Sequence, residues 1–157
     1  TFIAKELDVS FEDVDAIVIG AHGDSMVPLP RYATANSIPI SELLPESKVN
    51  AIVERAKKGS EEIFNLLKAG VTCYAPSAAI VEMIETILKN KKRILPCAAY
   101  CDKEYGIGGY FVGVPVKLGR NGVEEIIELK LTEDEKELFK KSVEHVKGLV
   151  STAEKFL

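Results

Sequence analysis

The chain of 157 residues is long enough for one domain with an ordinary hydrophobic core, and too short for two comfortable ones. It is 46% hydrophobic and 28% charged, which is typical of a folded globular protein and not of a disordered, collagenous or coiled-coil chain. The formal net charge of −4 and the lack of a basic tract give no support to a nucleic acid or an anionic membrane as partner.

The three cysteines, Cys73, Cys97 and Cys101, are an odd number and do not form a disulfide framework, so nothing indicates secretion. The Cys97–Cys101 spacing has no second pair and no nearby histidine, and we expect no metal site. The apolar runs are far shorter than the ~20 residues of a membrane span, and no basic-then-apolar leader opens the chain. We therefore expect a cytoplasmic protein.

The first part of the chain predicts one helix end and two short strands. Residues 1–7 are typical of the end of a helix whose beginning is not present. The β-branched run over 14–20 predicts a buried strand that ends at Gly20, followed by a polar loop over 21–25. Residues 32–37 are a candidate for a second short strand.

Two helices are predicted in the middle of the chain. Apolar residues recur three and four apart over 49–67, with Gly70 just beyond as the C-cap and Gly59 as a weak point inside. Pro76 suits the first turn of the next helix, whose apolar positions continue to Leu88.

The last third of the chain predicts strands over 94–101, 110–118 and 123–131, with Asn121-Gly122 as a hairpin signal because both residues tolerate positive φ. The segment 132–135 (TEDE) predicts a capping box that opens a final helix. A strand, helices, an antiparallel hairpin and a helix, in that order, indicate an α+β domain with mixed helices packed on an antiparallel sheet.

Two features that could bind phosphate have simpler explanations. The basic residues at 89 and 91–93 follow a helix, where the helix dipole favours cations, so a solvated helix end explains them. The segment 106–111 (GIGGYF) has Phe111 in place of the third glycine and precedes a strand, which favours a flexible turn over a nucleotide fingerprint. We expect no cofactor-binding residues in this chain.

His22 is the main candidate for chemistry. It lies between Ala21 and Gly23 at the end of the first predicted strand, and imidazole can give and take a proton near neutral pH. His145 is inside the last helix, where a packing or surface role suffices. Asp24 is too close along the chain to be an obvious partner for His22, and no serine has a nucleophile-elbow context. From these residues alone, a catalytic histidine and a solvated loop histidine both stay open.

The segment 20–29 (GAHGDSMVPL) resembles the active-site histidine segment of the lactate and malate dehydrogenase family. Three later stretches resemble the C-terminal half of these enzymes in the same order: 74–79 (YAPSAA), 93–100 (RILPCAAY) and 110–122 (YFVGVPVKLGRNG). Met26 before Val27-Pro28-Leu29, together with Tyr74-Ala75-Pro76, looks more like the malate than the lactate enzymes.

The resemblance implies that residues 1–157 are the C-terminal substrate-binding domain of an enzyme whose N-terminal Rossmann domain binds NAD and is not in this chain. His22 would be the proton donor and acceptor in the interconversion of malate and oxaloacetate. Thr72 corresponds to a position that lines the substrate pocket, although a packing role for it is equally plausible. The family also implies a homo-oligomer, a dimer or a tetramer.

Two family residues would lie upstream of Thr1: the Asp that orients the histidine and the Arg that binds the substrate carboxylate. Their loss should remove about 10⁴-fold or more of the activity, so we expect the isolated chain to be inactive. The residue that separates malate from lactate also lies upstream, which keeps lactate dehydrogenase as an alternative. A non-catalytic, self-associating module is the other alternative, because the apolar faces over 49–67 and 138–150 are candidates for an association surface beyond the needs of one small core.

Overall fold

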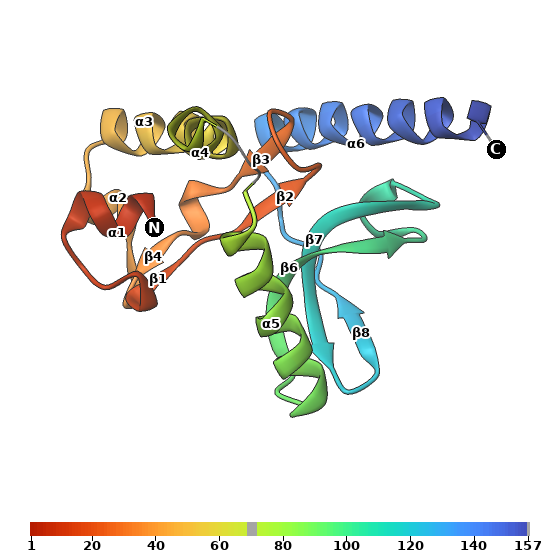
Figure 1. The fold of residues 1–157 in the computed structure, drawn as a ribbon, viewed down its shortest axis with the longest axis horizontal. Helices are drawn as coiled ribbons and strands as arrows, with labels where there is room; N and C mark the ends of the chain where they lie inside the picture. Colours follow the sequence, from red (N-terminus) through yellow and green to blue (C-terminus); the bar gives the residue numbers. More distant parts are fainter. Residues whose placement is uncertain (69–71, 157) are drawn as a thin grey trace.

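The computed structural model describes residues 1–68 and 72–156 of the chain. Its helices and strands form an antiparallel sheet with helices packed around it, which confirms the predicted α+β class (Figure 1). In chain order the elements are α1 (Phe2–Leu7), η1 (Phe11–Asp13), β1 (Val14–Asp15), β2 (Val18–Gly20), β3 (Met26–Pro28), η2 (Pro30–Tyr32), β4 (Thr34–Ala35), β5 (Ile38–Pro39), α2 (Ile40–Leu43), α3 (Glu46–Lys57), α4 (Gly59–Leu67), α5 (Tyr74–Leu88), β6 (Arg93–Cys101), η3 (Glu104–Gly106), β7 (Tyr110–Gly119), β8 (Gly122–Ile126), α6 (Glu133–Ala153) and η4 (Glu154–Phe156).

The larger sheet has the strand order β3-β2-β7-β6. Strand β8 also pairs with β7, along residues 116–119, and all pairs in this sheet are antiparallel. Its longest ladder joins β6 and β7, from Arg93 opposite Leu118 to Cys101 opposite Tyr110. A smaller sheet joins β1, β4 and β5. Strand β2 meets β7 only where Gly20 lies opposite Gly113, and this contact brings the first part of the chain onto the sheet.

The main core lies between the sheet and the helices α5 and α6. Alternate residues of β7, from Val112 to Leu118, belong to this core because successive side chains of a strand point to opposite faces. Met83 and Ile87 of α5 and Phe139 and Val143 of α6 pack into the same cluster. A second, smaller cluster around Ile3, Ala33, Ile40 and Val49 holds the first three α-helices together. None of the described helices is both long and apolar enough to cross a membrane.

The predicted strand over 14–20 is in fact two strands in different sheets. Residues Val14–Asp15 pair with β4, whereas Val18–Gly20 pair with β3 and β7. The chain changes sheets between them, which a continuous apolar run does not reveal. The candidate strand over 32–37 shrinks to Thr34–Ala35, because Tyr32 ends a 3₁₀ turn and Asn36 has a φ of 47°.

The predicted helical stretch over 49–67 is also divided, with α3 ending at Lys57 and α4 beginning at Gly59. The break falls at Lys58, whose ψ of 8° is not helical, next to the glycine that was the weak point of the prediction. The predicted C-cap, Gly70, lies outside the described residues.

The last third of the chain agrees with the sequence more closely. Strands β6 and β7 and the helix α6 form where predicted, and Thr132 and Glu135 make the capping box. The third strand ends early, at Ile126 rather than at residue 131. In the hairpin the positive φ belongs to Gly122 alone (83°), not to Asn121 as well.

Candidate functional site

His22 is exposed in the short turn that joins β2 to β3. The turn is closed by the Met26 N–H, which donates to the Gly23 carbonyl at 2.9 Å. Strand β2 ends at Gly20 with a φ of 90°, a conformation that glycine adopts without strain. The chain reverses after Gly20, because β3 pairs antiparallel with β2, and the imidazole lies in the turn at the strand end as predicted.

Helix α6 fixes the backbone just before His22. The Ser142 hydroxyl accepts a hydrogen bond from the Ala21 N–H at 2.8 Å, and Ser142 itself is fully buried. A Cβ atom on Gly20 would overlap the Ser142 side chain, and one on Gly113 would come within 2.5 Å of the Gly20 carbonyl oxygen. Sequence reasoning missed Ser142, because its only local signal is a polar residue on the apolar side of a helix.

A hollow of about 570 Å³ opens beside this turn, and both histidines of the chain line it. His145 lies one helical turn after Ser142 on α6, so the contact that anchors Ala21 also brings the second imidazole to the hollow. The other lining residues are apolar or small: Val18, Ile19, Gly20, Ala21, Met26, Pro96, Cys97, Ala98, Phe111, Gly113, Val146 and Leu149.

This lining contains no carboxylate, lysine or arginine among the described residues. The described wall can therefore supply an imidazole proton and an apolar surface, but no cation for a substrate carboxylate and no acid to orient His22.

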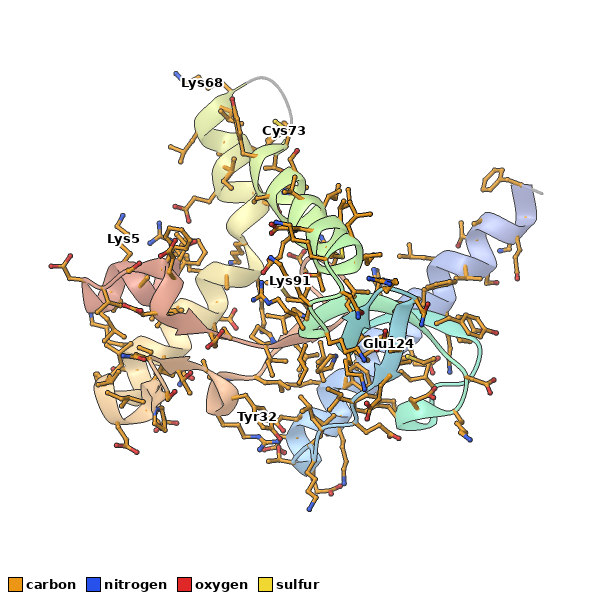
Figure 2. All side chains as sticks on the ribbon, turned by 90° about the horizontal axis from the view of Figure 1, so that it is seen from below. Lys5, Tyr32, Lys68, Cys73, Lys91 and Glu124 are labelled. Carbon is orange, nitrogen blue, oxygen red and sulfur yellow. The ribbon has the colours of Figure 1, made fainter. Side chains whose placement is uncertain are left out.

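Thr72 is not among the residues that line this hollow. It is half-buried between α4 and α5 and directly precedes Cys73, which Figure 2 shows at the far end of α5 from Lys91. Asp24 is exposed beside His22, and Ser25 buries its hydroxyl oxygen without a hydrogen-bond partner. Over residues 1–68 and 72–156, no three metal-ligating side chains gather in one place.

Arg31 and the lysines at the end of α5 do not line this hollow and are paired with glutamates. The Arg31 guanidinium binds both carboxylate oxygens of Glu135, at 2.8 and 3.0 Å, and lies over the Tyr32 ring near the start of α6 (Figure 2). This pairing lowers the pKa of Glu135. Lys89 and Lys91 pair with Glu85 and lower the pKa of its carboxyl to about 2. The basic end of α5 is thus an exposed helix end, as predicted, and the structure adds that its lysines pair with Glu85.

The glycine-rich segment is a turn that leads into β7. Gly106, Gly108 and Gly109 all have positive φ, and the Gly109 N–H donates to the Cys101 carbonyl at 2.7 Å. A dinucleotide fingerprint instead opens a helix, whose N-terminus receives the phosphates.

Comparisons with known proteins agree with this architecture. The malate dehydrogenase of Rhodopirellula baltica is 53% identical over all of this chain and 50% of its own length. The solved malate dehydrogenase of Salinibacter ruber superimposes with a TM-score of 0.94 at 52% identity, over 98% of this chain and 50% of that one. The lactate dehydrogenase of Eimeria maxima, solved with NADH and oxamate, gives 0.93 at 38% identity, over 98% of this chain and 48% of that one.

The fold and the hollow at the end of β2 define an α+β domain with an apolar hollow that is lined by two histidines. Residues 1–157 match the family described as lactate/malate dehydrogenase, alpha/beta C-terminal domain, and the chain belongs to that family. It spans about half the length of the relatives it matches.

Proposed function

We propose that this chain is the C-terminal, substrate-binding domain (residues 1–157) of an NAD-dependent malate dehydrogenase. The observation that carries the proposal is His22, which lies at the end of β2 beside the α6 anchor and lines a hollow whose described lining residues include no carboxylate, lysine or arginine. The cation and the orienting acid would come from the N-terminal half of the same enzyme. Relatives at 51–54% identity are named malate dehydrogenase, which favours malate and oxaloacetate as substrates.

In this proposal the N-terminal half would hold NAD, which would supply the hydride chemistry at C2 of the substrate. His22 donates a proton to the carbonyl oxygen of oxaloacetate, or accepts one from the malate hydroxyl in reverse. The apolar wall of the hollow excludes water from the reacting carbon, which strengthens the electrostatic interactions around it. Thr72 remains a candidate for substrate contact. A cytoplasmic homo-oligomer belongs to the same proposal.

Lactate dehydrogenase is the second candidate, because the Eimeria maxima enzyme has almost the same domain fold. Activity with oxaloacetate and with pyruvate separates the two. The intact mass of the natural protein is the first measurement to make. A mass about twice 17.2 kDa leaves room for a Rossmann domain, whereas 17.2 kDa favours the non-catalytic module.

The decisive test joins this chain at Thr1 to the N-terminal half of the Rhodopirellula baltica relative and follows NADH oxidation. We expect oxaloacetate-dependent activity that His22→Asn reduces by about 10³-fold or more, because general acid–base catalysis is lost together with substrate orientation. His145→Asn is the matched control, since it removes the other imidazole of the same hollow, and should retain most of the activity. Full activity of His22→Asn, or turnover by the isolated chain, would contradict the proposal.

A further inference from the structure

A second cavity, of about 650 Å³, lies between α6, the η3 turn and the segment 127–131 that leads into α6. It shares no lining residue with the hollow beside His22, and the function proposed above does not use it. Its volume is within the range of about 300–1,000 Å³ that small-molecule sites occupy.

The floor of this cavity is apolar. It is formed by Ile107, Leu129, Leu131, Phe139 and Val143. Phe139 and Val143 belong to the main core, and the Tyr105 ring tilts against Phe139 with 5.2 Å between ring centroids. The floor is therefore part of the rigid core and not a loose surface loop.

The polar atoms of the Tyr105 wall are already engaged. The Tyr105 hydroxyl donates to the Ile127 carbonyl and accepts from the Leu129 N–H, both at 2.8 Å. The Tyr105 N–H donates to Glu128 Oε2, also at 2.8 Å. This wall has few free groups to bind a polar ligand, so it favours an apolar body.

The rim, in contrast, carries excess positive charge. Four lysines (Lys130, Lys136, Lys140 and Lys147) and two glutamates (Glu128 and Glu144) line the cavity of a chain whose net charge is −4. Lys136 pairs with Glu133 at 2.7 Å, and Lys147 pairs with Glu144 at 2.8 Å. Lys130 and Lys140 form no ion pair with any described residue, so two ammonium groups at the rim lack a counter-charge.

We propose that this cavity binds a medium-chain carboxylate, with the alkyl chain on the apolar floor and the carboxylate at the lysine rim. Burial of methylenes on the apolar floor favours an alkyl chain over a small acid, while the lysines select an anionic head. The lysine stems extend the apolar surface and leave their charges at the opening, where a carboxylate can meet them.

The experiment titrates the chain with decanoate below its micelle concentration, by calorimetry and by ¹H–¹⁵N chemical shifts. We expect saturable binding with the largest shifts at residues 105–107 and 128–131, and weaker binding of decanol because it lacks the charge. Lys140→Glu should weaken decanoate binding by about five- to tenfold, as expected when an exposed favourable charge becomes unfavourable.

Lys141→Glu is the matched control, because Lys141 is the next residue on α6, makes the same charge change and does not line the cavity. It should leave decanoate affinity within about twofold of the parent chain. Absence of saturable binding, equal affinity for decanol, equal losses in the two variants, or shifts that map to the His22 hollow would each overturn the proposal. The thermal unfolding of both variants shows whether they are folded.

Discussion

At the scale of single residues, Gly20 combines a required backbone conformation with a required absence of a side chain. Its φ is 90°, and a Cβ atom there would overlap Ser142. Gly122 has a similar φ of 83°, but a Cβ atom there would meet nothing within 4 Å. Substitutions at these two glycines therefore distinguish the energetic cost of backbone strain from the cost of steric overlap.

We expect Gly122→Ala to destabilise the protein by about 1–2 kcal/mol through left-handed strain alone. Gly20→Ala should cost about 1–3 kcal/mol more, because the Ser142 side chain cannot move out of a packed core without displacing its neighbours. Urea unfolding of both variants measures the difference. Equal free energies of unfolding would show that the contact with Ser142 does not matter.

The three cysteines differ in exposure and in their expected reactivity. Cys73 is exposed, whereas burial raises the pKa of the Cys97 and Cys101 thiols, with smaller contributions from Glu82 and Glu104 respectively. A raised pKa leaves less thiolate, the reactive form, at a given pH.

At about pH 8 we expect one thiol to react rapidly with an aromatic disulfide reagent, and the other two only as pH rises further or as the protein unfolds. Cys73→Ser should abolish the rapid phase, and Cys97→Ser should leave it intact. Two rapid thiols in the native parent chain would show that Cys97 or Cys101 is more accessible than the structure indicates.

At the scale of elements, α6 links the two cavities and the turn of His22. Its N-terminus is fixed by the capping box, in which Thr132 Oγ1 accepts from the Glu135 N–H and the Glu135 carboxylate accepts from the Thr132 N–H at 2.8 Å. Arg31 binds the same carboxylate and lowers its pKa. The folded pKa of Glu135 is below its unfolded value, so the stability from this network is present above the unfolded pKa and decreases as pH falls through the folded one.

We expect Thr132→Ala to lower the free energy of unfolding by about 1 kcal/mol, within the range measured for N-cap residues. Thr152→Ala, near the other end of α6, is the control. Its hydroxyl donates only to the Gly148 carbonyl of the same helix on an exposed face, and its loss should change stability by less than about 0.5 kcal/mol. Chemical denaturation at neutral pH tests both, and equal losses would contradict a special role for the cap.

At the scale of the whole molecule, the helices expose more apolar surface than a self-contained domain needs. On α5, Tyr74 is 89% exposed, Val81 62% and Leu88 75%, and on α4 Leu66 is 74% exposed. Leu138 and Leu149 of α6 are also exposed, as the excess apolar faces in the sequence predicted. Apolar surface of this extent is typical of an association interface.

We expect the isolated chain to self-associate, with a light-scattering mass that rises above 17.2 kDa as protein concentration increases. The double substitution Val81→Lys and Leu88→Lys should shift the population toward monomer, because charged side chains are disfavoured in the centre of an interface. Asn50→Lys, an exposed polar position on α3, should not. A mass of 17.2 kDa at all concentrations would refute the expectation.

The sequence by itself determined the parts of this protein that depend on neighbours in the chain. The alternation in β6 and β7, the capping box of α6 and the position of His22 after a strand ending in glycine all follow from local patterns. The His22 segment, with the later motifs, also identified the family that the comparisons establish.

Only the tertiary structure decided which residues that are distant in the sequence contact one another. The bond from Ala21 to Ser142 joins residues 121 positions apart, and it also brings His145 to the hollow beside His22. The division of 14–20 between two sheets depends on partners about 20 residues away in β4 and, for Gly20, on Gly113 of β7, 93 residues away. Local propensity does not encode such pairings, because they are selected by the packing of the whole core.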